Sequence, residues 1–257
     1  MTREWVAIGT VIMLLGSNLF GLVYSMLVLK TKFFDSFVIQ EKPYQKSIFS
    51  KRMPLFIFNF ILLLSVSGVG AYFLYDLMEI SWTSWWIIAL QVLFAFIIDD
   101  FWFYFYHKWL HENKFMLKHV HSIHHRATKP FPLEYLYVHP LEWMMGMIGV
   151  VFAFAVILIF MPINLYAFWI FGLLRNLHEI HIHSDIEMPF FSKIPLLSKT
   201  KHHDDHHAYL KGNYASTFVW MDRIFKTNFY TFFFVNDKNS EKINNKQLLS
   251  SFEFLKK

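Results

Sequence analysis

The sequence predicts an all-α integral membrane protein, with about four transmembrane helices and a helical, histidine-rich cap on the cytoplasmic side. Hydrophobic residues make up 55% of the 257 residues and charged residues only 17%, against roughly 25% charged in a typical soluble protein. Long uncharged stretches alternate with short basic segments, and all 14 histidines lie between His107 and His207. This distribution separates a membrane-anchoring part from a histidine-rich part.

Two spans are expected before the first histidine. Residues 5–29 carry no charge and exceed the roughly 20 residues that a helix needs to cross the hydrocarbon core. A cleaved signal peptide is the alternative, but this run is too long and no small-residue cleavage site follows it. Residues 55–75 form a second uncharged run after Lys51 and Arg52, with Pro54 at the expected helix start.

A third span is expected at residues 82–106. Residues 141–174 are also apolar except for Glu142, and Pro162 and Asn164 lie near their middle. We therefore interpret this stretch as two spans, or as one span and a re-entrant helix, with a turn at residues 161–164.

The basic residues predict the orientation in the membrane. Residues 53–107 contain no lysine or arginine, whereas residues 30–52, 107–142 and 175–257 are rich in them. By the positive-inside rule these three segments are cytoplasmic. The net charge of +5 is accounted for in this way, and nucleic acid is not an expected partner because no basic run with interleaved aromatics occurs.

The absence of cysteine excludes thiolate metal sites and cysteine nucleophiles. Any metal must therefore be bound by histidine, aspartate or glutamate. A histidine-rich set of ligands without thiolates suits iron, zinc or copper.

Four histidine clusters recur at short spacings. Side chains three or four residues apart share one face of a helix, as two ligands of one metal must. The clusters are His107 and His111; His121, His124 and His125; His178, His181 and His183; and His203, His206 and His207. They contain more imidazoles than one ion can use, so two metal ions are predicted.

Asp99 and Asp100 lie within the third apolar stretch, where an ionised group is costly and usually functional. Asp100 precedes His107 by two helical turns. We predict that Asp100 accepts a hydrogen bond from a histidine ring or is itself a ligand, with helix-end capping as the alternative. Glu142 and Asp185 are similar candidates.

These residues resemble the membrane-bound fatty acid hydroxylase superfamily, in particular its sterol desaturase and C-4 methylsterol oxidase branch. The resemblance covers roughly residues 85–230. The matching strings are DFWFYFYHKWLH at 100–111, HSIHHRATKPFPLEYLYVHPLE at 121–142 and HHDDHHAYLKGNYASTFVWMDRIFKT at 202–227. The segment NYASTFVWMDRIFKT is also similar to alkylglycerol monooxygenase.

The resemblance implies a membrane anchor under a cytoplasmic cap, a histidine-bound pair of metal ions taken to be iron, and O2-dependent hydroxylation or desaturation of a lipid. Zinc is a substitute metal. The family's ligand positions correspond to His107, His111, His121, His124, His125, His183, His203, His206 and His207. His178, His181 and His139 are further candidates.

The expected partners are a lipid substrate from the bilayer and a separate electron donor of the cytochrome b5 or ferredoxin type. The donor is implied by the resemblance and by the absence of a flavin or nicotinamide fingerprint. The expected domains are N-terminal transmembrane helices at 1–84, a fatty acid hydroxylase-like catalytic domain at 85–232 and a polar C-terminal tail at 233–257.

Two other functions are weighed against the oxygenase. A metal-ion transporter is expected to hold its ligands near the bilayer midplane in paired halves. A zinc-dependent lipid hydrolase needs one metal ion and leaves roughly half of the histidines without a role. The short cap, the lack of cysteine and the absence of an appended electron-carrier domain favour a bacterial cytoplasmic membrane over the endoplasmic reticulum.

Overall fold

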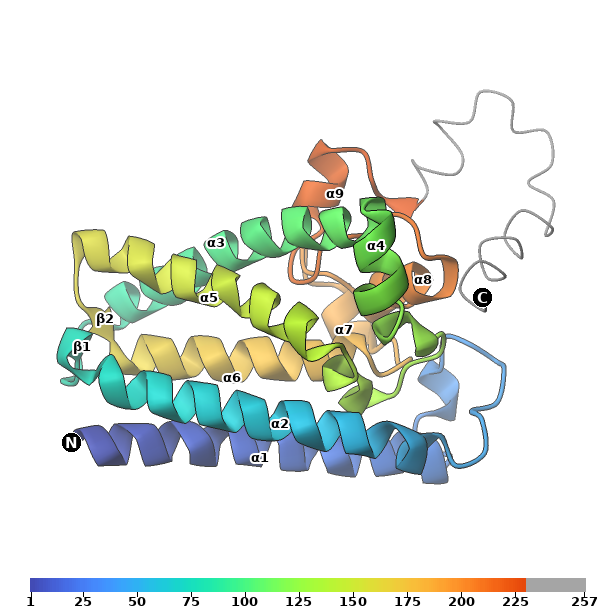
Figure 1. Ribbon diagram of the computed structural model, residues 1–257, viewed down its shortest axis with the longest axis horizontal. Helices are drawn as coiled ribbons and strands as arrows, with labels where there is room; N and C mark the ends of the chain where they lie inside the picture. The colour runs from blue at the N-terminus through green and yellow to red at the C-terminus, as the bar shows by residue number, and fades with distance from the viewer. Residues whose placement is uncertain (230–257) are drawn as a thin grey trace.

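Five long helices form the body of the computed structural model, which describes residues 1–229 (Figure 1). The polar tail expected at 233–257 lies outside the described residues. The long helices are α1 (Arg3–Lys30), α2 (Ile48–Phe73), α3 (Trp85–Glu112), α5 (Pro140–Phe160) and α6 (Leu165–Ile182).

The short elements lie at the two ends of these helices (Figure 1). At one end η2 (Tyr75–Leu77) leads into β1 (Met78–Glu79), which pairs in parallel with β2 (Ile163–Asn164). The remaining short elements lie at the other end. They are η1 (Asp35–Phe37), α4 (Lys114–Met116), the π-helical turn η3 (Leu117–His121), η4 (His124–Arg126), η5 (Pro132–Leu136), α7 (Pro189–Ser192), α8 (Thr200–Tyr209) and α9 (Trp220–Ile224).

Within residues 1–229, four helices are long and apolar enough to cross a membrane: α1, α2, α3 and α5. This number agrees with the expectation of about four spans. α6 is not among the four, although it packs along α1 and α3. The turn expected at 161–164 is confirmed, because α5 ends at Phe160 and α6 begins at Leu165. Pro54 lies inside α2 rather than at its start.

The outer surface of the helices is strongly apolar. Trp5, Phe58 and Val151 are more than half exposed. Such a surface is unfavourable in water and is expected where a helix faces lipid tails. The surface therefore agrees with an integral membrane protein.

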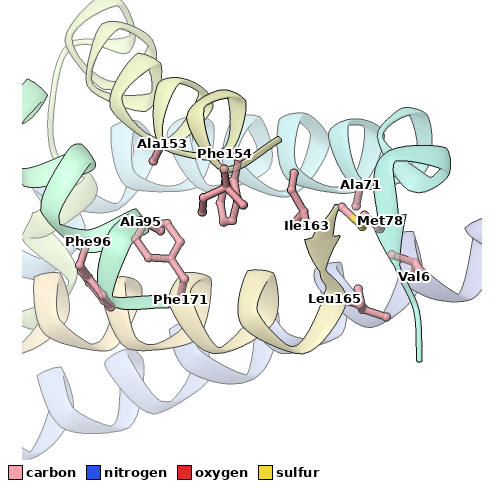
Figure 2. Close-up of a cluster of buried hydrophobic side chains, with 11 residues drawn as sticks. Val6, Ala71, Met78, Ala95, Phe96, Ala153, Phe154, Ile163, Leu165 and Phe171 are labelled. Carbon is pink, nitrogen blue, oxygen red and sulfur yellow. The ribbon is translucent and has the colours of Figure 1, made fainter. Parts of the chain in front are cut away.

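An apolar core holds the helices together near the β1–β2 end. Figure 2 shows Phe154 and Phe171 facing each other across the bundle, with Phe96 beside them. The ring centroids of Phe171 and Phe96 are 4.8 Å apart, and those of Phe154 and Phe171 are 5.5 Å apart. Ala95 and Ala153 are fully buried, and their small side chains allow α3 and α5 to approach closely. This core fixes the positions of the long helices relative to one another.

Residues 113–139 and 183–229, which we call the cap, cover the opposite end of the bundle (Figure 1). The connection from α1 to α2, residues 31–47, forms a strap against the cap. Its backbone pairs with residues after α6, through hydrogen bonds from Ile39 N to the Asp185 carbonyl and from Glu187 N to the Phe37 carbonyl, both 2.9 Å long. The strap therefore ties the end of α1 to the histidine-bearing segments.

Candidate metal centre

Nine of the predicted ligand histidines, from the end of α3 and from the cap, gather into two groups. In each group the candidate ligand atoms all lie within 4.8 Å of one another. Group 1 consists of His107, His111, His121, His125 and His206, and group 2 consists of His124, His183, His203 and His207. All of these residues except His111 are buried.

The two HxxHH strings each contribute to both groups. His121 and His125, four residues apart, belong to group 1, whereas His124 between them belongs to group 2. In the second string, His203 and His207 belong to group 2, whereas His206 belongs to group 1. The groups are therefore adjacent, and the rings of His125 and His207, one from each group, have centroids 5.0 Å apart. The expectation that all three histidines of a string share one face is only partly right.

The ring nitrogens that face each other have the spacing of ligands around a metal ion. In group 1 the Nε2 atom of His121 is 2.8 Å from that of His111 and 2.9 Å from that of His125. In group 2 the Nε2 atoms of His203 and His183 are 3.0 Å apart. A metal–nitrogen bond of about 2.1 Å places neighbouring ligand nitrogens about 3.0 Å apart in an octahedron and about 3.4 Å apart in a tetrahedron.

Five of the rings are oriented by a protein acceptor at Nδ1. Because a carbonyl or carboxylate oxygen only accepts, Nδ1 carries the hydrogen and the Nε2 lone pair points into the group. The pairs are His107 with the Tyr214 carbonyl (2.7 Å), His206 with the Gly212 carbonyl (2.7 Å), His183 with the Glu179 carbonyl (2.8 Å), His121 with Glu142 Oε1 (2.8 Å) and His124 with the Tyr137 carbonyl (3.4 Å).

The cap histidines are held in the neutral form that metal ligation requires. Burial is the main cause, and it lowers the pKa of His124 and of His183 to about 3. Burial and the neighbouring rings also lower the pKa of His203 and His207 well below the usual value. Neutral rings whose lone pairs face each other at about 3 Å repel unless a cation lies between them. The residues therefore fit two metal ions.

One loop, residues 212–216, supplies backbone acceptors to three histidines. Besides the Gly212 and Tyr214 carbonyls, the Ser216 carbonyl accepts a hydrogen bond from Nε2 of His178 at 3.1 Å. Gly212 has a φ of +72°, and a Cβ there would lie 2.7 Å from the Thr227 carbonyl oxygen. We call this segment the acceptor loop.

Asp100 anchors the segment that follows the acceptor loop. It accepts hydrogen bonds from the backbone N–H groups of Thr217 and Phe218, at 2.9 and 3.2 Å, and from Trp220 Nε1 at 2.9 Å. The prediction that Asp100 is a metal ligand or accepts from a histidine ring is therefore wrong. Its carboxylate accepts hydrogen bonds from the backbone instead, because the chain after residue 216 folds back onto α3.

Asp222 holds the acceptor loop itself and was not singled out by sequence reasoning. Its carboxylate accepts from the N–H groups of Tyr214 (3.0 Å) and Ala215 (2.9 Å), from Nε2 of His202 (3.0 Å) and from the Thr227 hydroxyl (2.7 Å). Burial raises the pKa of Asp222, but the hydrogen bonds outweigh it and lower the pKa overall. The only sequence signal was its place in the matched string.

The three further candidates lie outside both groups. His178 donates to the acceptor loop. His181 lies 3.4 Å from both the Tyr24 hydroxyl and the Thr200 hydroxyl. His139 caps α5, with Nδ1 accepting from Leu141 N at 3.1 Å. Their roles as metal ligands are corrected to structural roles.

Of the two additional carboxylates, only Glu142 reaches a histidine. Asp185 binds the strap instead, since Oδ1 accepts from Gln40 N at 3.0 Å and Oδ2 lies 3.1 Å from Lys129 Nζ. The Gln40 amide also donates to the Thr128 carbonyl at 3.0 Å and to Asp204 Oδ1 at 2.6 Å. These contacts join the three segments that carry group 2.

The family model for fatty acid hydroxylases matches residues 92–227. The chain is 36% identical over 146 residues to methylsterol monooxygenase 1 of Rattus norvegicus and 40% identical over 149 residues to a very-long-chain aldehyde decarbonylase of Oryza sativa. It is also 39% identical over 150 residues to methylsterol monooxygenase 2-2 of Arabidopsis thaliana.

Each alignment covers 56% of this chain, and it covers 48% of the rat protein and 54% of each plant protein. The chain thus spans about half the length of the curated relatives it matches. No solved structure matches the chain. Because the family model covers more than half of the residues, the protein belongs to the fatty acid hydroxylase family.

Proposed function

We propose that the protein is a membrane-bound, non-haem diiron oxygenase that hydroxylates or desaturates a lipid C–H bond with O2 and external electrons. The observation that carries the proposal is the division of nine histidines into two adjacent groups with facing Nε2 atoms. A single-metal hydrolase would leave one of these groups without a role. The position of both groups at one end of the bundle also disfavours a transporter site at the bilayer midplane.

Group 1 and group 2 would each hold one iron ion. Iron is favoured by the thiolate-free imidazole ligands and by the family, and zinc is a substitute with the same ligand preference. A bound iron pair would supply the activation of O2 that oxidation of an unreactive C–H bond requires.

The chain's own residues orient the ligands and exclude water. The acceptor loop and Glu142 hold His107, His206 and His121 in one tautomer. A small cavity of about 90 Å³ lies beside His107 and His124, with Tyr106 and Leu110 in its walls. A lipid carbon that enters this cavity would meet the histidine groups in a largely apolar space.

The lipid substrate is proposed to enter from the bilayer, because α3, which carries His107 and His111 of group 1, is one of the four helices apolar enough to span it. Two relatives are named for methylsterols and one for very-long-chain aldehydes, which supports a sterol or a long-chain lipid. We retain the cytoplasmic orientation, a cytochrome b5- or ferredoxin-type donor and residues 85–232 as the catalytic domain as proposals. The bacterial membrane stays a prediction, and these relatives are eukaryotic.

The proposal is tested by O2 consumption of the purified protein, loaded with ferrous iron in lipid nanodiscs and supplied with a chemical reductant. Mass spectrometry would then follow the label from isotopic O2 into a 4-methylsterol and a long-chain aldehyde. We expect an oxidised lipid, labelled if it is hydroxylated and two hydrogens lighter without label if it is desaturated, from the wild type and from His119→Ala, an exposed histidine outside both groups. None is expected from His124→Ala. Metal-independent turnover would contradict the proposal.

A further inference from the structure

A buried charged pair joins α6 to α3 inside the bundle. Arg175 Nε donates to Asp99 Oδ2 at 2.6 Å, and the Asp99 side chain is only 4% exposed. Gly149 of α5 lies against the same carboxylate, since a Cβ there would be 2.6 Å from Asp99 Oδ1. Charged side chains are costly inside an apolar bundle of this kind and are usually retained for function.

Arg175 lies where two cavities meet. The larger cavity, about 280 Å³, is bounded by α1, α2, α5 and α6 and is lined mostly by apolar side chains such as Leu63 and Phe154. The smaller cavity, about 90 Å³, extends to His107 and His203. Arg175 lines both, so a molecule that reaches from the larger cavity to the histidines passes its guanidinium.

The guanidinium has N–H donors that the Asp99 hydrogen bond does not use. An arginine has five N–H donors, and the hydrogen bond to Asp99 uses only the one at Nε. In the part of the chain that the structure describes, no other hydrogen bond from Arg175 is formed. The neighbouring Asn176 is different, because its amide binds Ser17 and the Tyr135 hydroxyl. The free donors of Arg175 are therefore available to a ligand in the cavities.

We propose that Arg175 binds a neutral oxygen, a hydroxyl or carbonyl group, of the lipid substrate. This deepens the proposed function and rests on it. The larger cavity exceeds the roughly 150 Å³ that holds a benzene-sized molecule and receives the apolar body of the lipid. The smaller cavity has room for only a few carbon atoms, so the carbon to be oxidised lies a few bonds from the oxygen.

The charges around Arg175 favour a neutral oxygen over a carboxylate. Asp99 already pairs with the guanidinium, and Glu142 and Glu179 line the smaller cavity on the side of the histidines. Two carboxyl groups thus line the smaller cavity together with Arg175, in addition to the paired Asp99. An anionic head group would add another negative charge to a desolvated site that already holds carboxyl groups, which is unfavourable. A hydroxyl or carbonyl oxygen accepts hydrogen bonds from the free N–H groups without adding a charge.

The test measures binding without turnover. Full-length protein in nanodiscs, both metal-free and iron-loaded, is melted in the presence of octadecanol, octadecane or octadecanoate at about pH 9, where the acid is ionised. Each lipid that binds the native state raises the melting temperature by mass action. We expect octadecanol to reach half-saturation at a mole fraction about tenfold or more below that of octadecane and octadecanoate, as one charge-assisted hydrogen bond allows.

Arg175→Met should bring octadecanol to the level of octadecane, while Arg175→Lys should retain part of the preference. The double variant Asp99→Asn, Arg175→Met removes both charges and is used if the single variant does not fold. Equal binding of octadecanol and octadecane by the wild type, or an unchanged preference in both methionine variants, would overturn the proposal. Tightest binding of octadecanoate would overturn it as well. Iron content is measured in parallel and tests the metal site separately. Failure of the Arg175 proposal can therefore be distinguished from failure of the proposed iron site.

Discussion

Glu142, in the first turn of the span α5, accepts a hydrogen bond from Nδ1 of His121 in η3, with Oε1 and Nδ1 2.8 Å apart. The contact connects a membrane helix directly to group 1. Within residues 1–229 the other carboxylate oxygen, Oε2, is buried and accepts no hydrogen bond. The only histidine that hydrogen-bonds to Glu142 among these residues is therefore His121.

Replacing Glu142 by glutamine should weaken metal binding by about 10- to 100-fold, which is typical when a partner of a ligating histidine is removed. The amide loses the negative charge that raises the basicity of His121. Competition with a chelator measures the affinity. Glu112→Gln is the matched control, because Glu112 pairs with Lys108 on an exposed face of α3. Equal affinities of the two variants would contradict the role of Glu142.

Asp222→Asn should destabilise the acceptor loop. An amide presents one accepting oxygen to the four donors that now share the carboxylate, and hydrogen bonds to charged groups contribute about 1.5–3 kcal/mol each. We expect the free energy of unfolding to fall by about 3 kcal/mol, together with lower metal content. Thermal melting compared with Asp205→Asn, a partly exposed residue paired with Lys201, measures this. An unchanged melting temperature would show that the Asp222 carboxylate does not stabilise the acceptor loop.

Lys129→Met should disturb group 2 through the strap. It leaves the Asp185 carboxylate, which is fully buried, without its ion pair, and breaking a buried pair costs about 3–5 kcal/mol. Lys201→Met is the control, because its exposed pair with Asp205 contributes at most about 1 kcal/mol. Denaturation of both variants in the same detergent compares them. Similar stabilities would show that the strap contributes little.

Acid should destabilise the metal-free protein. Unfolded histidines bind protons below about pH 6.5, whereas burial lowers the pKa of His124 and His183 to about 3 in the folded state. The stability that depends on these histidines is therefore present above pH 6.5 and is lost as the pH falls. The loss is about 1.4 kcal/mol per pH unit for each histidine.

The melting temperature of metal-free protein, followed by tryptophan fluorescence, should thus be several degrees lower at pH 5.5 than at pH 7.5. A melting temperature that stays constant or rises on acidification would show that the histidines are not buried in the neutral form.

The spans and the histidine pairs at i and i+4 were predictable because each rests on local spacing. The turn after α5 was also predictable, since Pro162 precedes Asn164, whose side chain caps α6 by accepting from Tyr166 N and Ala167 N. These features depend on neighbours in the sequence.

The division of the histidines and the role of Asp100 were not predictable. The acceptors of His107 and His206 are backbone carbonyls of the acceptor loop, and a backbone carbonyl has no signature in a sequence. Asp100 binds N–H groups more than 100 residues away, so its helical face alone did not reveal its partner. The free N–H donors of Arg175 were likewise not predictable, because the cavities that they line are formed only in the folded structure.

Metal stoichiometry tests the central claim most directly. Elemental analysis with Mössbauer spectroscopy should find about two irons per chain in the wild type and in His119→Ala. The variant His111→Ala, His125→Ala, which disrupts group 1, and the variant His183→Ala, His203→Ala, which disrupts group 2, should each retain about one iron. A single metal ion in the wild type, zinc in place of iron after loading, or full iron content in both variants would contradict a two-iron centre.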